Sequence, residues 1–308
     1  MPFYSKTGET LCSFTCKKLS WVQSIHPHMQ PHRIPTLFTV ALHVPMKTLV
    51  SSTHALATID SSGIATLTIR DAGTLNILST PVIRELTSAL NELAHVTDIR
   101  VLIFRGSGDK AFVAGANINE MAKLNRKTAV DFISGLRDLC EATRTFPVPV
   151  IARIPGWCLG GGLELAMACD IRIATQGTQF GMPEVKVGIP SVIHATLMPR
   201  LIGQAHAAWL LLSGENIGTE QATQWGLINE TVAQDELDQR VTTIAANFSA
   251  LGPAVLRQQK ALLRRWEQLS LPDAIADSVQ EFGKAFETGE PQKFMNDFLE
   301  HKKKNKKT

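Results

Sequence analysis

A repeated order of strand, small-residue turn and helix constrains the fold of this chain most. Residues 101–104 and 150–154 are short, continuous apolar runs, which are typical of buried parallel strands. Small residues follow each run, at 110–118 and at 155–162, and a helical pattern follows each turn. Ligands of open α/β sheets bind at the carboxyl ends of the strands. The repeat therefore predicts one α/β domain of stacked ββα units, with a site where the two turns meet.

Shorter-range signals predict the remaining elements. Segments 55–60 and 64–70 are rich in β-branched residues with an alternating pattern, and the turn residues 61–63 separate them. This pattern indicates a hairpin. Pro81 suits the first turn of a helix that runs to about residue 95, and a second helix is expected over about 127–145. Beyond the central turn we expect short strands at 171–174 and 179–180, which we pair as a hairpin. Helical segments without further strands should follow, from 190 onward and at 204–213, 219–225, 235–248 and 253–300, with a break near Pro272.

Composition separates a folded middle from two basic ends. Residues 1–54 hold five Lys/Arg and one acid, and residues 301–308 hold five lysines and no acid. Without these ends the chain has 21 basic and 27 acidic residues, which argues against a nucleic-acid surface. No apolar run reaches the roughly 18–20 residues that span a bilayer, so we expect no membrane span. We divide the chain into an extension at 1–54, a core at 55–250, a helical C-terminal region at 251–300 and a basic tail at 301–308.

Three interpretations of residues 1–54 stay open. The segment is basic, poor in acids and without hydrophobic periodicity, as expected for an organelle-targeting leader. The same composition fits a disordered extension, or sequence upstream of a true start at Met46. A leader predicts a mitochondrial protein, whereas the other two interpretations leave a cytoplasmic or peroxisomal location. The chain ends Lys306-Lys307-Thr308, which is not a peroxisomal tripeptide.

The five cysteines form neither a CxxC pair nor a metal-ligand pattern with histidine, and we expect no metal site. Their odd number without a framework indicates buried thiols in a reducing compartment. Cys158 lies beside the central turn, where we interpret it as a small core residue rather than as a nucleophile.

The central turn, Gly160-Gly161-Gly162, begins a helix that should run to about residue 168. The first N–H groups of a helix lack intrahelical partners and can face an anion or a developing oxyanion. The turn is not a P-loop, because no lysine and Ser/Thr follow the glycines. It is not a dinucleotide-binding fingerprint either, because the pattern G-x-G-x-x-G is missing. Glu164 lies in the first helical turn, where a carboxylate also complements the helix dipole. Glu184 would return toward it through the expected hairpin, and two carboxylates without metal ligands suit acid–base chemistry.

These segments resemble the signature segments of the crotonase (enoyl-CoA hydratase/isomerase) superfamily. Residues 110–121 and 154–166 carry the likeness, residues 169–174 and 179–184 continue it, and it extends over about 55–300. The resemblance implies an α/β spiral of ββα units with a helical C-terminal trimerisation region, assembled as a homotrimer or hexamer. It also implies an acyl-CoA substrate and no separate cofactor, since coenzyme A is part of the substrate.

The same resemblance assigns the site. The backbone N–H groups of Ala116 and Gly161 would form an oxyanion hole for the thioester oxygen. Hydratases of the superfamily carry glutamates at the positions of Glu164 and Glu184, whereas typical isomerases match only the second. The implied activity is an enoyl-CoA hydratase, in which Glu164 deprotonates the water that attacks C3 and Glu184 protonates C2. The substrate would be lined by Ala114, Gly115, Asn117, Ile118 and Gly160.

Departures from the family pattern keep alternatives open. Arg70-Asp71-Ala72 stands where the family usually has Asn-Arg-Pro, and 190–195 read Pro-Ser-Val-Ile-His-Ala instead of Pro-Gly-x-Gly-Gly-Thr. The altered loop 188–196 leaves room for an enoyl-CoA isomerase or a specialised acyl-CoA (de)hydratase of secondary metabolism. His194 either faces the acyl end or is an ordinary core or surface histidine. Lys302 and Lys303 either reach a CoA phosphate or are a solvated tail. A weakly catalytic CoA- or RNA-binding scaffold is the remaining class, against which the acidic middle and the paired glutamates argue.

Overall fold

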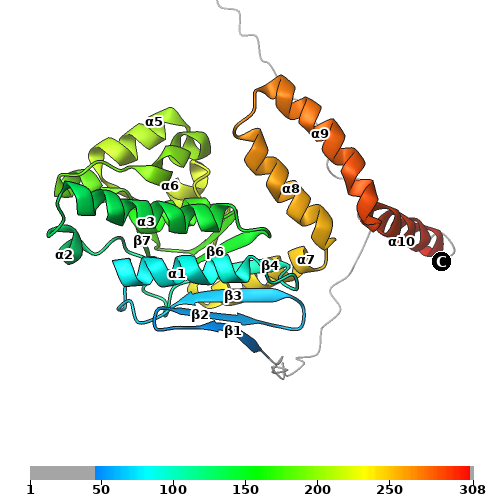
Figure 1. Cartoon of the computed structure of the whole chain (residues 1–308), viewed down its shortest axis with the longest axis horizontal. Helices are drawn as coiled ribbons and strands as arrows, with labels where there is room; N and C mark the ends of the chain where they lie inside the picture. Colours follow the sequence, from blue (N-terminus) through cyan, green and yellow to red (C-terminus); the bar gives the residue numbers. More distant parts are fainter. Residues whose placement is uncertain (1–45, 306–308) are drawn as a thin grey trace, which may run out of the picture. The chain divides into compact units, whose positions relative to one another are not determined.

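The computed structural model describes residues 46–305, and its elements are labelled in Figure 1. The strands are β1 (Lys47–Ser51), β2 (Ala55–Ile59), β3 (Ile64–Ile69), β4 (Val101–Arg105), β5 (Ala111–Val113), β6 (Val150–Ile154), β7 (Trp157–Leu159), β8 (Ile171–Thr175), β9 (Gln179–Gly181), β10 (Asn216–Gly218) and β11 (Glu230–Val232). The α-helices are α1 (Thr80–Leu93), α2 (Ile118–Met121), α3 (Arg126–Arg144), α4 (Gly161–Ala168), α5 (Met198–Ser213), α6 (Thr219–Gln224), α7 (Leu237–Ser249), α8 (Pro253–Trp266), α9 (Leu271–Ala285) and α10 (Glu290–Asn305). Four 3-10 turns complete them: η1 (Pro183–Val187), η2 (Ile193–Leu197), η3 (Gln234–Glu236) and η4 (Phe286–Thr288).

Two sheets organise these strands. The larger has the order β1-β2-β3-β4-β6-β8-β11 and the smaller has the order β10-β9-β7-β5. In the larger sheet β1, β2 and β3 are antiparallel neighbours, and every pair from β3 to β11 is parallel. In the smaller sheet β5, β7 and β9 are parallel, and β10 is antiparallel to β9. The expected hairpin at 55–70 is therefore confirmed as β2 and β3.

The chain moves between the two sheets in each repeat. β4, β6 and β8 lie side by side in the larger sheet, and the strand that follows each of them, β5, β7 and β9, lies in the smaller one. A helix then leads back to the next repeat, α3 after β5 and α4 after β7. This confirms the predicted α/β spiral of ββα units.

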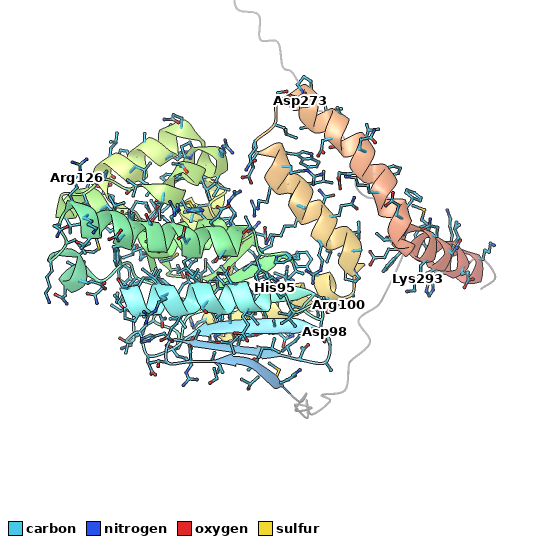
Figure 2. The ribbon with its side chains drawn as sticks, in the orientation of Figure 1. His95, Asp98, Arg100, Arg126, Asp273 and Lys293 are labelled. Carbon is cyan, nitrogen blue, oxygen red and sulfur yellow. The ribbon has the colours of Figure 1, made fainter. Side chains whose placement is uncertain are left out.

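Both faces of the larger sheet are covered, which explains its continuous apolar strands. Leu102 and Phe104 of β4 belong to the main core with α1 and α3, whereas Val101 and Ile103 belong to a second core beneath α7. α1 and α3 lie side by side. The two helices run in the same direction. In Figure 2, Arg126 marks the start of α3 at the left, and His95, just beyond the end of α1, lies at the right.

Three parts of the expected topology are wrong. Residues 171–174 and 179–180 do not pair as a hairpin, because β8 joins β6 and β11 in the larger sheet while β9 joins β7 in the smaller one. β1 lies inside the segment assigned to the N-terminal extension, since it pairs with β2 at the sheet edge. β10 and β11 interrupt the helices that were expected to follow without strands. The leader interpretation of residues 1–45 falls outside the described residues.

The C-terminal helices form an arm of α8, α9 and α10. α8 and α9 lie side by side in Figure 1, and the expected break falls at 267–270, where Ser270 caps α9 and Pro272 occupies its first turn. Lys260 and Arg264 of α8 bind the two carboxylate oxygens of Asp170 at 2.7 and 2.6 Å, which joins the arm to the end of α4. Among residues 46–305, no helix is long and apolar enough to cross a membrane.

Candidate active site

The ends of three parallel strands assemble the site. β5, β7 and β9 are neighbours in the smaller sheet, so the residues after each strand emerge along one edge. These residues are the turn at 114–117, the turn at 160–164 and the segment that reaches Glu184. Gly160 N–H donates to Gly181 O at 2.9 Å, which joins the second and third of these segments directly. The two carboxylates therefore meet through strand pairing in the smaller sheet, not through the expected hairpin.

The segment 75–78 fixes the first turn from both sides. Ala114 N–H donates to Leu75 O at 3.0 Å, and Leu78 N–H donates to Gly115 O at 3.0 Å. Asn117 N–H in turn donates to Leu78 O at 2.9 Å. This pattern leaves the Ala116 N–H between them without a hydrogen-bond acceptor in the described part of the chain.

Glycine is required in the second turn for two separate reasons. Gly160 has φ 52° and ψ −127°, a conformation that side-chain-bearing residues rarely adopt. A Cβ on Gly162 would overlap the Val113 carbonyl oxygen, so α4 begins directly against the end of β5. Leu163 and Glu164 N–H groups both donate to Gly160 O, whereas Gly161 N–H, at the first position of α4, finds no acceptor among residues 46–305. Two unengaged N–H groups, on Ala116 and Gly161, thus follow adjacent strands.

Glu164 is almost fully buried, with 3% of its surface exposed. Its Oε1 accepts a hydrogen bond of 2.9 Å from Ala195 N–H in η2. Burial raises the pKa of Glu164 to about 8; the Ala195 N–H opposes this shift, and the charge of Glu184 adds to it. The carboxyl can therefore exchange a proton near neutral pH.

Glu184 lies against Gly160. Its Oε1 occupies the space where a Cβ on Gly160 would be, and its Oε2 accepts a 3.0 Å hydrogen bond from Ser191 Oγ. Burial raises the pKa of Glu184, and the Ser191 hydroxyl opposes that shift. The central turn thus carries two carboxyl groups of raised pKa, Glu164 within it and Glu184 against Gly160, an arrangement suited to proton transfer.

The remaining predicted residues have mixed surroundings. Asn117 caps α2 by accepting from Glu120 N–H, so its side chain is engaged, and Ile118 is exposed. Lys302 and Lys303 are exposed on α10, and no contact within the described residues joins them to the glutamates. Four of the residues predicted to line the substrate lie in or directly after the first turn: Ala114, Gly115, Asn117 and Ile118. The fifth, Gly160, lies in the second turn.

Two neighbours of the glutamates were not predicted as site residues. Ser191 bonds Glu184, and His194 precedes the residue whose N–H bonds Glu164. Both lie in the loop that departs from the family pattern, and that departure was the available signal. His194 is buried and bonds Glu141 of α3, which matches the interpretation as a core histidine.

We assign no role in this arrangement to the described cysteines. Cys140, Cys158 and Cys169 are free and buried, and burial raises the pKa of each, which disfavours the reactive thiolate. Within residues 46–305 no group of three His, Cys, Asp or Glu side chains could hold a metal ion.

A cavity of about 800 Å³ lies away from the glutamates. Its lining includes Asp98 and Arg100, which precede β4 and are labelled in Figure 2. It also includes residues 60–63, which precede β3. The cavity therefore lies at the amino ends of the parallel strands β3 and β4. The glycine turns, in contrast, follow the carboxyl ends of β5 and β7. We therefore assign the chemistry to the turns and not to this cavity.

Comparison with known proteins finds relatives that are named as enoyl-CoA hydratases. The profile of the family described as enoyl-CoA hydratase/isomerase matches residues 60–307. The short-chain-enoyl-CoA hydratase of Clostridium acetobutylicum is 32% identical over 241 residues, which cover 78% of this chain and 92% of that protein. The crotonyl-CoA hydratase of Syntrophomonas wolfei is 35% identical over 243 residues, covering 79% and 94%. A probable mitochondrial enoyl-CoA hydratase of Dictyostelium discoideum is 33% identical over 237 residues, covering 76% and 84%.

Solved structures show the same fold. The enoyl-CoA hydratase of Bacillus anthracis superposes with a TM-score of 0.75 at 28% identity, covering 83% of this chain and 96% of that one. Pseudomonas aeruginosa DspI gives a TM-score of 0.78 at 28% identity, covering 82% and 96%. With the family profile matched over most of its length, the chain belongs to the enoyl-CoA hydratase/isomerase family.

Proposed function

We propose that this protein is an enoyl-CoA hydratase that adds water reversibly across the 2,3 double bond of an acyl-CoA thioester. The observation that carries the proposal is the pair of glutamates at the central turn: Glu164 is buried, Glu184 is half-buried against Gly160, and the pKa of each is raised. An isomerase moves a proton between two carbons and needs one such carboxyl, whereas hydration needs a base for water and an acid for carbon. The relatives named as hydratases support the same assignment.

One shared proton on the glutamate pair serves both directions of the reaction. In hydration, Glu164 accepts a proton from water while the water oxygen bonds C3, and Glu184 gives its proton to C2. In dehydration, Glu184 takes the C2 proton, and Glu164 protonates the departing hydroxyl. Burial raises the pKa of both groups, and the charge of Glu184 raises the pKa of Glu164 further, which disfavours ionisation of both carboxyl groups at once.

The negative charge that develops on the thioester oxygen needs donors that are already in place. Ala116 and Gly161 N–H groups suit this role, because neither has an acceptor within the described chain and both follow adjacent strands. Removing one such donor typically costs roughly 2.7–4 kcal/mol of transition-state stabilisation. The reaction requires no cofactor besides the coenzyme A of its substrate, which passes the small residues 114–115 and Gly160.

Hydration of crotonyl-CoA, followed by the loss of enoyl-thioester absorbance, tests the proposal directly. We expect turnover that depends on enzyme concentration and yields 3-hydroxyacyl-CoA. A longer enoyl-CoA series then ranks the acyl chain lengths. Formation of 3-enoyl-CoA without hydroxyacyl product would instead favour the isomerase that the altered loop 188–196 leaves open. An absence of turnover at every chain length, in protein that still binds CoA, would contradict a hydratase.

We further propose a homotrimer or a hexamer, because the arm exposes an apolar face that a single chain does not cover. Contiguous exposed apolar surface marks association sites. The exposed large apolar residues of the arm are Val255, Leu263, Trp266, Leu269, Leu271, Ile275, Val279, Phe282, Phe286, Phe294, Met295, Phe298 and Leu299. Light scattering after size exclusion should give a mass three or six times that of the chain. A monomer mass would contradict this assembly.

A mitochondrial location is proposed from the basic, acid-poor composition of residues 1–54 and the location named for the Dictyostelium relative. Fractionation of eukaryotic cells expressing the full chain, compared with a chain that starts at Met46, tests it. Mitochondrial enrichment of the full chain alone is expected. Identical distributions of the two chains would contradict a leader.

A further inference from the structure

The bond that holds Glu164 depends on the backbone of η2. Ala195 N–H is 2.9 Å from Glu164 Oε1 and also 2.9 Å from Val192 O, so one donor is shared between two acceptors. A small rotation of η2 would turn this N–H wholly toward the loop carbonyl and away from the carboxylate. The orientation of η2 therefore controls one hydrogen bond of Glu164.

The residue before His194 holds an unfavourable backbone conformation. Ile193 has φ 40°, in the left-handed region that β-branched residues avoid. Such a conformation persists only where surrounding contacts impose it. A contact from outside the turn is needed.

His194 supplies one such contact, in addition to the packing of Ile193 and Ala195 against the main core. Its imidazole is buried, and Nε2 lies 3.3 Å from Glu141 Oε2 on α3. Arg144 fixes the acceptor, because its Nε and Nη2 bind the two Glu141 oxygens at 3.0 Å each. The partner of His194 is therefore held on a 19-residue helix by a bidentate ion pair.

The imidazole is best assigned as neutral. With Nε2–H donated to Glu141, its buried Nδ1 has no hydrogen-bond partner among residues 46–305, so a second proton there would be unsatisfied. Burial lowers the pKa of His194, the Glu141 carboxylate opposes this shift, and the Arg144 charge adds to it. His194 is thus a fixed hydrogen-bond donor and not an acid–base group of the reaction.

We propose that His194 is a positioning residue for the hydration chemistry. Its hydrogen bond to Glu141 holds η2 in the conformation in which Ala195 N–H binds Glu164 Oε1. The proposal rests on the proposed function for its catalytic consequence, but the contact itself does not. The His194 side chain thereby acts through the backbone of η2, since its imidazole bonds Glu141 and not Glu164.

Kinetics of His194 variants test the catalytic consequence. His194→Leu removes the donor but keeps an apolar side chain of similar size, and kcat should fall roughly 10- to 100-fold with KM changed less than about threefold. The pH profile of kcat should shift to higher pH, because Glu164 loses a donor that favours its ionised form. His194→Gln can place an amide N–H near the Nε2 position, so it should recover kcat to within about threefold of the original enzyme.

A double-mutant cycle separates this contact from general loop damage. Glu141→Leu should match His194→Leu, and the double variant should be no slower than either single variant, since one bond is removed each time. His206→Leu is the control: His206 is an exposed histidine of α5 that stacks on Trp225 and bonds Ile202 O, and it makes no contact with Glu141. Its kcat and pH profile should stay unchanged.

A measurement without substrate keeps the two proposals apart. The difference in unfolding free energy between the original chain and Glu164→Gln, followed with pH, reports the pKa of Glu164. The same difference in a His194→Leu background should report a higher pKa. An unchanged pKa, or additive losses in the double-mutant cycle, would overturn the role of His194 even in a chain that hydrates nothing. Normal hydration by His194→Leu would overturn it while leaving the hydratase intact.

Discussion

The wall of the site formed by α4 and the wall formed by residues 183–197 are held in place by different means. α4 starts flush against β5, and its first residues are glycines whose close contacts admit no side chain. The opposite wall consists of two short 3-10 turns, and side chains hold it: Ser191 bonds Glu184, and His194 bonds Glu141. We therefore expect changes at the glycines of the α4 wall to damage folding, and changes on the loop wall to alter catalysis in a folded protein.

The glutamates themselves are the strongest way to test whether both walls serve one reaction. Glu164→Gln and Glu184→Gln keep the side-chain shape, and each should lower kcat by about 10²-fold or more, as for other positioned acid–base groups. Steady-state hydration of crotonyl-CoA measures both. A near-normal rate for one variant would contradict a role for that glutamate, and so for its wall of the site, in proton transfer.

The packing of α4 should be broken by a single methyl group. Gly162→Ala places a Cβ against the Val113 carbonyl, a backbone atom that cannot move aside, and should lower the unfolding free energy by roughly 2–4 kcal/mol. Urea unfolding measures the loss. Gly135→Ala in α3 is the matched control, since its Cβ would meet only Ile83 Cγ2 at 3.5 Å, and it should gain about 0.5–1 kcal/mol. Equal stabilities for the two variants would contradict the close packing assigned to α4.

The pH dependence of stability should carry the signature of Glu164. Its pKa is about 8 in the folded chain against a reference value of 4.5, so between these values the folded state holds a proton that the unfolded state has lost. Stability should consequently fall as pH rises through this window, by up to a few kcal/mol from this group. Glu164→Gln should flatten the fall and be the more stable protein at pH 9. Parallel stability curves for the two proteins from pH 5 to 9 would contradict the raised pKa.

The smallest effect should come from the hydroxyl on the loop wall. Ser191→Ala removes one donor to Glu184, and the loss of about 1 kcal/mol corresponds to a roughly fivefold lower kcat/KM, with unfolding almost unchanged. Ser213→Ala is a suitable control, because that exposed hydroxyl bonds only helix backbone and the loop after it. A larger fall in stability than in activity would show that Ser191 holds the fold instead of the carboxylate.

The α4 wall was predictable from the sequence, and the loop wall was not. Gly160–Gly162 and Glu164 lie within one strand–turn–helix pattern, so local rules place them together. The contact between His194 and Glu141 joins positions 53 apart, and Ser191 bonds Glu184 across a turn without periodicity. No local rule reports such pairs.

The errors in topology have the same origin. β10 and β11 contain three residues each, too few for an alternating pattern. β8 and β9 are adjacent in sequence, but the turn between them crosses from one sheet to the other. Only the pairing of distant strands decides which sheet each joins.

The ion pairs of α8 also bear on how this protein melts. Arg264 binds both Asp170 at the end of α4 and Glu267, and Glu267 binds Arg144, the same arginine that holds Glu141. Release of α8 would therefore unpair charges at the end of α4 and on α3 together. Such shared partners favour loss of the arm and the core as one cooperative unit instead of fraying from the C-terminus. Amide exchange in α8 should accordingly slow toward the rates of the buried strands, whereas α10, beyond the last of these pairs, should exchange early.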